Sequence, residues 1–121
     1  MGLSTRGFLN SGQLNRHYQA HGAEFECASA AEYEEQADTF LSGSLSTSAF
    51  QCVRKQGDLV RYDTSTQAYG VLDKNRVIRT FFKPVPCASV PALARKAVAQ
   101  SGRCHGQATN LLYFQSECQK W

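Results

Sequence analysis

Two histidines, four residues apart, are the residues whose type and spacing most directly suggest chemistry. His17 and His21 fall in a segment that favours helix, where residues four apart share one side. Histidine titrates near neutral pH and suits general acid and base catalysis. The structural alternative is one histidine at the edge of the core and one exposed. A metal site would need a third ligand, from His105 or a cysteine, and because the spacing fits no zinc pattern we expect no metal.

Three cations and a threonine in the second half of the chain form another candidate group. Arg61, Arg79 and Lys83 fall on neighbouring strands of an expected sheet. Positive groups at that range could stabilise a phosphorane-like transition state, and Thr80 could donate a hydrogen bond to a phosphate oxygen. The alternative is an exposed sheet face that carries solvated charge. Tyrosine rings, among them Tyr113, could stack on bases or simply pack in the core.

Most of these residues lie on the run from Arg76 to Pro84. Its nearly continuous apolar character predicts a strand covered on both faces, as in the centre of a sheet. The alternative is a strand with one solvent-exposed edge. Because side chains alternate between the two faces of a strand, Thr80 shares a face with Ile78 and Phe82, the face expected beneath the N-terminal helices. Arg79 then points to the opposite face. Both residues could line one cleft only if the strand is bulged, so Thr80 ranks above Arg79 as a site residue.

Two helices are expected before the strands. The first spans Leu14 to His21 and ends at a glycine, and residues 1–12 are expected to be a loose lead-in. The second spans Ala30 to Leu41 and opens on the capping-box pair Ser29 and Glu32. Its acidic residues are expected to form a solvated outer face: Glu32, Glu34, Glu35 and Asp38.

The sequence then changes to period two and predicts an antiparallel meander with short turns. The expected strands are Ala49 to Lys55, Leu59 to Asp63, Gln67 to Leu72 and Arg76 to Lys83. Beyond the last strand, Ser89 to Gln100 predicts a helix, and Thr109 to Trp121 is expected to dock on the body as a short helix or an extended segment. Together these elements predict an α+β fold, with N-terminal helices packed on a four-stranded antiparallel sheet and a further C-terminal helix.

Length and composition are those of one globular domain. The chain has 121 residues, of which 42% are hydrophobic and 19% charged, and no apolar run approaches membrane-spanning length. The beginning, Met1-Gly2-Leu3, does not resemble a secretory signal, so we expect an excised domain. A net charge of +3 permits a nucleic-acid partner without requiring one.

The five cysteines are an odd number, so at least one is unpaired within a monomer. They show no Cys-x-x-Cys spacing, so the usual zinc and thioredoxin-like signatures are absent. Cys87 and Cys104 bracket one segment and could form a disulfide in an oxidising compartment.

An ordered set of motifs between His17 and Phe114 resembles a known family. The motifs are His17-Tyr-Gln-Ala-His21-Gly22, Glu24-Phe25, Ser29-Ala-Ala-Glu-Tyr33 with Ala37 and Phe40-Leu41, Gly57-Asp58-Leu-Val-Arg61-Tyr62, Tyr69-Gly70-Val71, Ile78-Arg79-Thr80-Phe-Phe-Lys83-Pro84 and Thr109-Asn110-Leu-Leu-Tyr113-Phe114. They resemble the C-terminal toxin domains of bacterial polymorphic toxins, including Rhs-type and contact-dependent inhibition effectors. The similarity is to the branch with a barnase–EndoU–colicin–RelE-like ribonuclease fold. Tyr69 stands where that motif usually has Phe, and residues 85–104 are expected to be a helical insertion relative to it.

The resemblance implies a metal-independent endoribonuclease, often a tRNase, that needs no cofactor and is neutralised by a cognate immunity protein. It implies delivery as part of a larger effector and action in the cytoplasm of a target bacterium, and we expect a monomer when the domain is free. His17, His21, Arg61 and Thr80 are then the expected catalytic residues, and Arg79, Lys83 and Tyr113 the expected substrate-binding residues.

Two other function classes remain open from the sequence. The domain could be a non-catalytic module whose sheet binds a protein, in which case RNA would survive incubation with it. It could also be a toxin of other chemistry, such as an ADP-ribosyltransferase, whose activity would require NAD.

Overall fold

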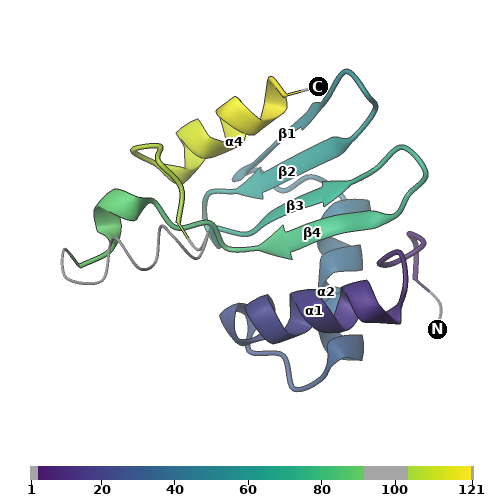
Figure 1. Cartoon of the computed structure of the whole chain (residues 1–121). Helices are drawn as coiled ribbons and strands as arrows, with labels where there is room; N and C mark the ends of the chain where they lie inside the picture. The colour runs from purple at the N-terminus through teal and green to yellow at the C-terminus, as the bar shows by residue number, and fades with distance from the viewer. Residues whose placement is uncertain (1–2, 92–103, 121) are drawn as a thin grey trace.

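The computed structural model describes residues 3–91 and 104–120, and it has the predicted α+β architecture. Its elements, in chain order, are α1 (Ser11–His21), η1 (Gly22–Phe25), α2 (Ala30–Ser42), β1 (Ala49–Val53), β2 (Leu59–Asp63), β3 (Tyr69–Leu72), β4 (Ile78–Phe82), η2 (Cys87–Ser89) and α4 (Asn110–Cys118). The two N-terminal helices lie on one side of the sheet and α4 lies on the other (Figure 1). The fold predicted from the sequence is therefore confirmed.

The strands form an antiparallel meander in the order β1-β2-β3-β4. β4 therefore lies at the edge of the sheet, and the interpretation of its apolar run as a central strand is wrong. The run is apolar because both of its faces are covered: Ile78 and Phe81 pack with the N-terminal helices, and Phe82 packs in the cluster on the α4 side. Part of its edge is covered too, since the backbone N–H of Ile78 donates to the carbonyl of Gly7 over 2.8 Å.

A β-bulge in β4 changes which residues share a face. Leu72 pairs with Ile78 and Val71 pairs with Thr80, so Arg79 is an extra residue without a partner in β3. After the bulge, Phe81 joins Ile78 on the helical face, while Thr80 joins Phe82 on the α4 face. The expectation that Thr80 lies with Ile78 beneath the N-terminal helices is therefore wrong, because one extra residue reverses the alternation.

The segment before α1 is packed against α2, which corrects the prediction of a loose lead-in. Phe8 is buried in the main core cluster. The carboxylate of Asp38 accepts hydrogen bonds from Thr5 N at 2.7 Å, Thr5 Oγ1 at 2.6 Å and Ser4 N at 3.1 Å. Glu34 accepts a further bond from the N–H of Phe8. Asp38 is buried, so the acidic residues of α2 are only partly the solvated face that the sequence predicted.

Two disulfides fix the C-terminal part of the chain. Cys52 of β1 is bonded to Cys118 of α4, across 66 positions of sequence, and Cys87 is bonded to Cys104 as the sequence allowed. Cys27 is the unpaired cysteine. The helix predicted over residues 89–100 falls mostly outside the described residues. None of the helices within 3–91 and 104–120 combines the length and the apolar character that crossing a bilayer requires.

Candidate functional site

Five half-buried rings form a row across the end of β4. The ring of His17 lies 6.3 Å from that of His21, which lies 5.2 Å from Phe82. Phe82 is 6.4 Å from Tyr113, and Tyr113 stacks on His105 at 4.4 Å. These residues come from α1, β4, α4 and the segment before α4, which meet at the left-hand end of β4 in Figure 1. We call this set, His17, His21, Phe82, Tyr113 and His105, the ring row.

The two histidines of α1 share one side of the helix, as predicted. Asn10 caps the start of α1 through its side chain, and Leu14 and Tyr18 pack on the core, which turns the histidine side of the helix toward β4. Burial lowers the pKa of His17, and the neighbouring charges of His21 and Arg16 lower it further. His17 is therefore neutral at neutral pH.

The side chain of His21 has a carboxylate partner on the next element. Its Nδ1 lies 2.8 Å from Oε2 of Glu24, while Oε1 of the same carboxylate accepts the backbone N–H of Lys83 at 2.7 Å. α1 runs directly into the 3-10 turn η1, which brings residue 24 back toward residue 21. Gly22 is required at this junction, because a Cβ there would lie 2.5 Å from the ring of Tyr18.

Three of the predicted site residues line one cavity of about 210 Å³ on the α4 side of β4. They are Arg79, Thr80 and Tyr113. Arg79 also lines a second cavity, of about 430 Å³, together with His17. The bulge is what allows adjacent Arg79 and Thr80 to reach the same cavity. Arg79 thus connects the histidine side of the edge to the threonine and tyrosine side.

The walls of the smaller cavity include charged residues that the sequence analysis missed. Arg54 is buried, and it donates to the carbonyl of Glu117 at 2.8 Å, to the carboxylate of Glu117 at 3.1 Å and to the hydroxyl of Tyr69 at 3.4 Å. Asp58 lies 3.6 Å from the same guanidinium. Burial, followed by the charge of Glu117, raises the pKa of Tyr113 to about 12, so its hydroxyl stays protonated. Glu117 is 63 positions from Arg54 and Tyr69 is 15, so no local pattern signals these contacts.

His105 has both ring nitrogens engaged. Nδ1 accepts the backbone N–H of Gln107 at 3.2 Å, so the proton is on Nε2, which donates to Oδ1 of Asn110 at 2.8 Å. Its backbone pairs with Val85 and with Cys87, next to the disulfide of Cys87. These contacts fix the His105 ring against Tyr113 and leave neither nitrogen free for proton transfer.

Arg61 and Lys83 lie away from this cavity. Arg61 donates from Nη1 to the carbonyls of Phe40 at 3.0 Å and Gly43 at 2.6 Å, at the C-terminal end of α2. Helix ends leave such carbonyls unpaired, so this contact explains a cation on β2. The ammonium of Lys83 lies 5.3 Å from the ring centroid of Phe25, on the η1 side.

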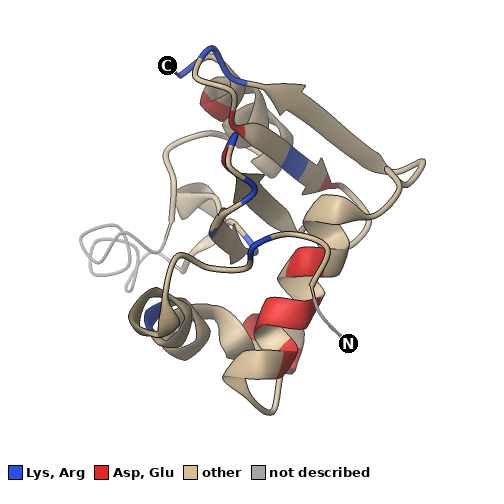
Figure 2. Ribbon diagram, turned by 90° about the vertical axis from the view of Figure 1, so that its right-hand side faces the viewer, with Lys and Arg blue, Asp and Glu red and all other residues tan. Residues whose placement is uncertain are grey.

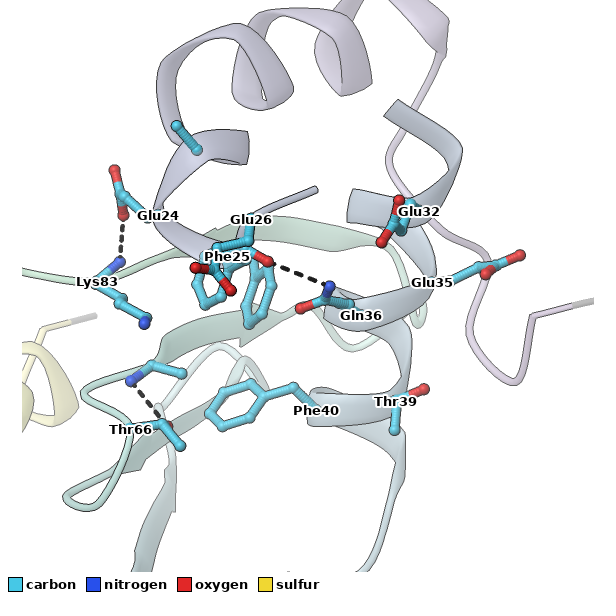
Figure 3. Close-up of a pocket in the computed structure, with 13 residues that line it drawn as sticks. Glu24, Phe25, Glu26, Glu32, Glu35, Gln36, Thr39, Phe40, Thr66 and Lys83 are labelled. Carbon is cyan, nitrogen blue, oxygen red and sulfur yellow. Dashed lines mark hydrogen bonds between the residues drawn. The ribbon is translucent and has the colours of Figure 1, made fainter. Parts of the chain in front are cut away.

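A further cavity, of about 920 Å³, lies between η1, α2 and β4 and is acidic (Figure 3). Its walls carry Glu24, Glu26, Glu32 and Glu35, with Phe25, Phe40 and Phe81 between them. In Figure 2 the ribbon of α2 is red at several places, where its acidic residues stand. Carboxylates repel phosphate, so this cavity is unfavourable to a nucleic-acid backbone.

Among residues 3–91 and 104–120, no three or more His, Cys, Asp and Glu side chains are grouped so that they could hold a metal ion. No protein-family model matches this sequence, and a comparison with curated proteins finds no significant relative.

Proposed function

We propose that this domain is a metal-independent endoribonuclease toxin that cleaves RNA through attack by the ribose 2′-hydroxyl. The observation that carries the proposal is the ring row beside Arg79 and Thr80. It brings two histidines, stacking rings, a cation and a hydroxyl to one edge of the sheet. Those groups are what 2′-hydroxyl attack on a phosphodiester requires.

His17 and His21 divide the proton transfers. Neutral His17 takes the proton from the 2′-hydroxyl, and the 2′-oxygen attacks the adjacent phosphorus. As the bond from phosphorus to the 5′-oxygen breaks, protonated His21 gives its proton to that oxygen. The products are a 2′,3′-cyclic phosphate and a free 5′-hydroxyl. DNA has no 2′-hydroxyl and survives.

Arg79 and Thr80 hold the phosphate while this happens. The guanidinium of Arg79 is exposed between the two cavities and offsets the charge that develops on the phosphate oxygens. The hydroxyl of Thr80 donates a hydrogen bond to one of them. Phe82 and Tyr113 offer ring faces to unstacked bases, the usual way single-stranded RNA is recognised. Lys83 lines the acidic cavity, where the surrounding carboxylates weaken its attraction for the RNA backbone.

The resemblance to polymorphic toxin domains supports tRNA as the substrate and an immunity protein as the partner. We propose delivery of the domain to a bacterial competitor, where it acts in the cytoplasm. The cognate immunity protein would carry acidic residues that meet Arg79 and Lys83.

The test is incubation of the purified domain with total RNA in EDTA, followed by mapping of the cleaved ends. Cleavage with cyclic phosphate ends, no cleavage of DNA, and loss of activity by about two to four powers of ten in His17→Ala and His21→Ala support the proposal. Intact RNA overturns it and favours the non-catalytic interaction module, whereas activity that depends on NAD favours an ADP-ribosyltransferase. In cells, expression without the immunity protein should arrest growth.

A further inference from the structure

We infer that Glu24 is a positioning residue that fixes the tautomer and the orientation of His21 against β4. This inference rests on the proposed function only for its effect on catalysis, because the arrangement itself can be measured without RNA. Glu24 belongs to a motif of the family resemblance, but it was not among the catalytic or substrate-binding residues that the sequence predicted.

One carboxylate serves two donors. Oε1 of Glu24 accepts the backbone N–H of Lys83, which follows the last residue of β4 (Figure 3). A backbone N–H is always a donor, so this bond requires an acceptor at that oxygen. Oε2 is then left for Nδ1 of His21 at 2.8 Å. A carboxylate oxygen accepts, so Nδ1 carries the proton and the neutral ring leaves Nε2 unprotonated.

The contact also fixes where the His21 ring lies. Glu24 sits on η1, and the backbone after it turns through Glu26 in the left-handed conformation, with φ of 56°. Because the Glu24 carboxylate is bonded to the end of β4, the His21 ring is held 5.2 Å from Phe82 and thus in its place in the ring row, between His17 and Phe82. Nε2 of His21 is then the nitrogen that donates a proton to the leaving 5′-oxygen.

Glutamine cannot replace Glu24 in both contacts. A glutamine side chain has the same shape but only one acceptor oxygen. If that oxygen keeps the bond to Lys83 N–H, the amide NH₂ faces His21, and Nδ1 must lose its proton to accept it. If the oxygen faces His21, the Lys83 N–H loses its partner. Glu24→Gln therefore either moves the proton of neutral His21 to Nε2 or breaks the hydrogen bond from the Lys83 N–H at the end of β4.

The experiment is ¹⁵N NMR of the histidine rings in the whole 121-residue chain, alongside kcat and KM for RNA cleavage. In the wild type, neutral His21 should be the Nδ1–H tautomer. In Glu24→Gln either the Nε2–H form should become dominant or the amide signal of Lys83 should shift as it loses its acceptor, and kcat should fall about 100-fold or more with KM little changed. His105, held as Nε2–H by Gln107, is an internal control whose signals should not move.

Glu26→Gln is the matched control, because Glu26 is the neighbouring exposed carboxylate of the same acidic cavity and makes no contact with His21 among the described interactions. It should leave the tautomer and kcat as in the wild type. The inference is overturned if wild-type His21 is already Nε2–H, or if Glu24→Gln shifts neither the tautomer of His21 nor the amide signal of Lys83. It is also overturned if the tautomer shifts while kcat is retained. A wild type that does not cleave RNA removes the proposed function, but the tautomer measurement still decides whether Glu24 positions His21.

Discussion

Arg79 and Thr80 are adjacent in β4, yet their side chains line the same cavity, because Arg79 is the unpaired residue of a β-bulge. On a regular strand they would point to opposite faces. The bulge thus places a cation and a hydroxyl within reach of one phosphate. It also places Arg79 next to His17, in the neighbouring cavity.

Because both residues face one cavity, Thr80→Val and Arg79→Gln should each reduce RNA cleavage. We expect about tenfold or more for Thr80→Val, since a hydrogen bond to a charged group contributes roughly 1.5–3 kcal/mol, and at least as much for Arg79→Gln. Initial rates at saturating RNA check this. Lys74→Gln, an exposed cation of the β3–β4 turn, is the control and should retain activity. Full activity in Arg79→Gln would remove this residue from the site.

The lowered pKa of His17 sets the pH dependence of cleavage. A general base must be unprotonated, so kcat/KM should fall on acidification only as pH passes through this lowered pKa, below the ordinary value of 6.5. A pH–rate profile measures the midpoint of that acid limb. In His17→Ala the residual kcat/KM should not show this fall on acidification. An acid limb centred at or above pH 6.5 would contradict the assignment of His17 as the base.

Arg61→Gln should reduce stability and leave the chemistry intact, because Arg61 donates to the two carbonyls at the end of α2 and lies away from the Arg79 cavity. The loss should be about 1–3 kcal/mol, the cost of leaving partly buried carbonyls unpaired. Urea unfolding measures it, and cleavage should be assayed well below the unfolding midpoint. Should the folded variant be inactive while its stability is unchanged, Arg61 would return to the catalytic set that the sequence predicted.

Asp38→Ala should release the segment before α1 and destabilise the domain by about 3 kcal/mol, since hydrogen bonds to a buried carboxylate contribute roughly 1.5–3 kcal/mol. Burial acts to raise the pKa of Asp38, but the hydrogen bonds from Thr5 and Ser4 outweigh it and lower the pKa. Its contribution to stability is therefore complete above about pH 3.8 and is lost as pH falls through the lowered value. Hydrogen exchange of the Thr5 and Phe8 amides checks the release.

A control for this effect is Glu35→Ala, an exposed acid of the same helix. Its stability should stay within about 0.5 kcal/mol of the wild type, as for most surface substitutions. Equal losses in both variants would mean that Asp38 acts only through the general charge of α2.

The sequence by itself determined the order of the elements and most of their limits. Period two from Ala49 onward matches the meander, and β2 has the predicted bounds, Leu59–Asp63. The Ser29 cap fixes the start of α2, since its side chain accepts the N–H of Glu32. The spacing of His17 and His21 placed them on one side of α1. These features depend on residues close in sequence, whose geometry is set by local backbone preferences and caps.

Only the tertiary structure decided which of these residues meet. A bulge adds one residue to one strand, so every later side chain of that strand points to the opposite face of the sheet. The alternation of residue types along Ile78–Phe82 does not reveal such a bulge. Arg54 donates to Glu117, 63 positions away. Arg61 donates to carbonyls 18 and 21 positions away, and Asp38 accepts from residues 33 and 34 positions away. Contacts at such separations form because packing leaves buried polar groups that must find a partner, and the identity of that partner depends on how helices and sheet are oriented.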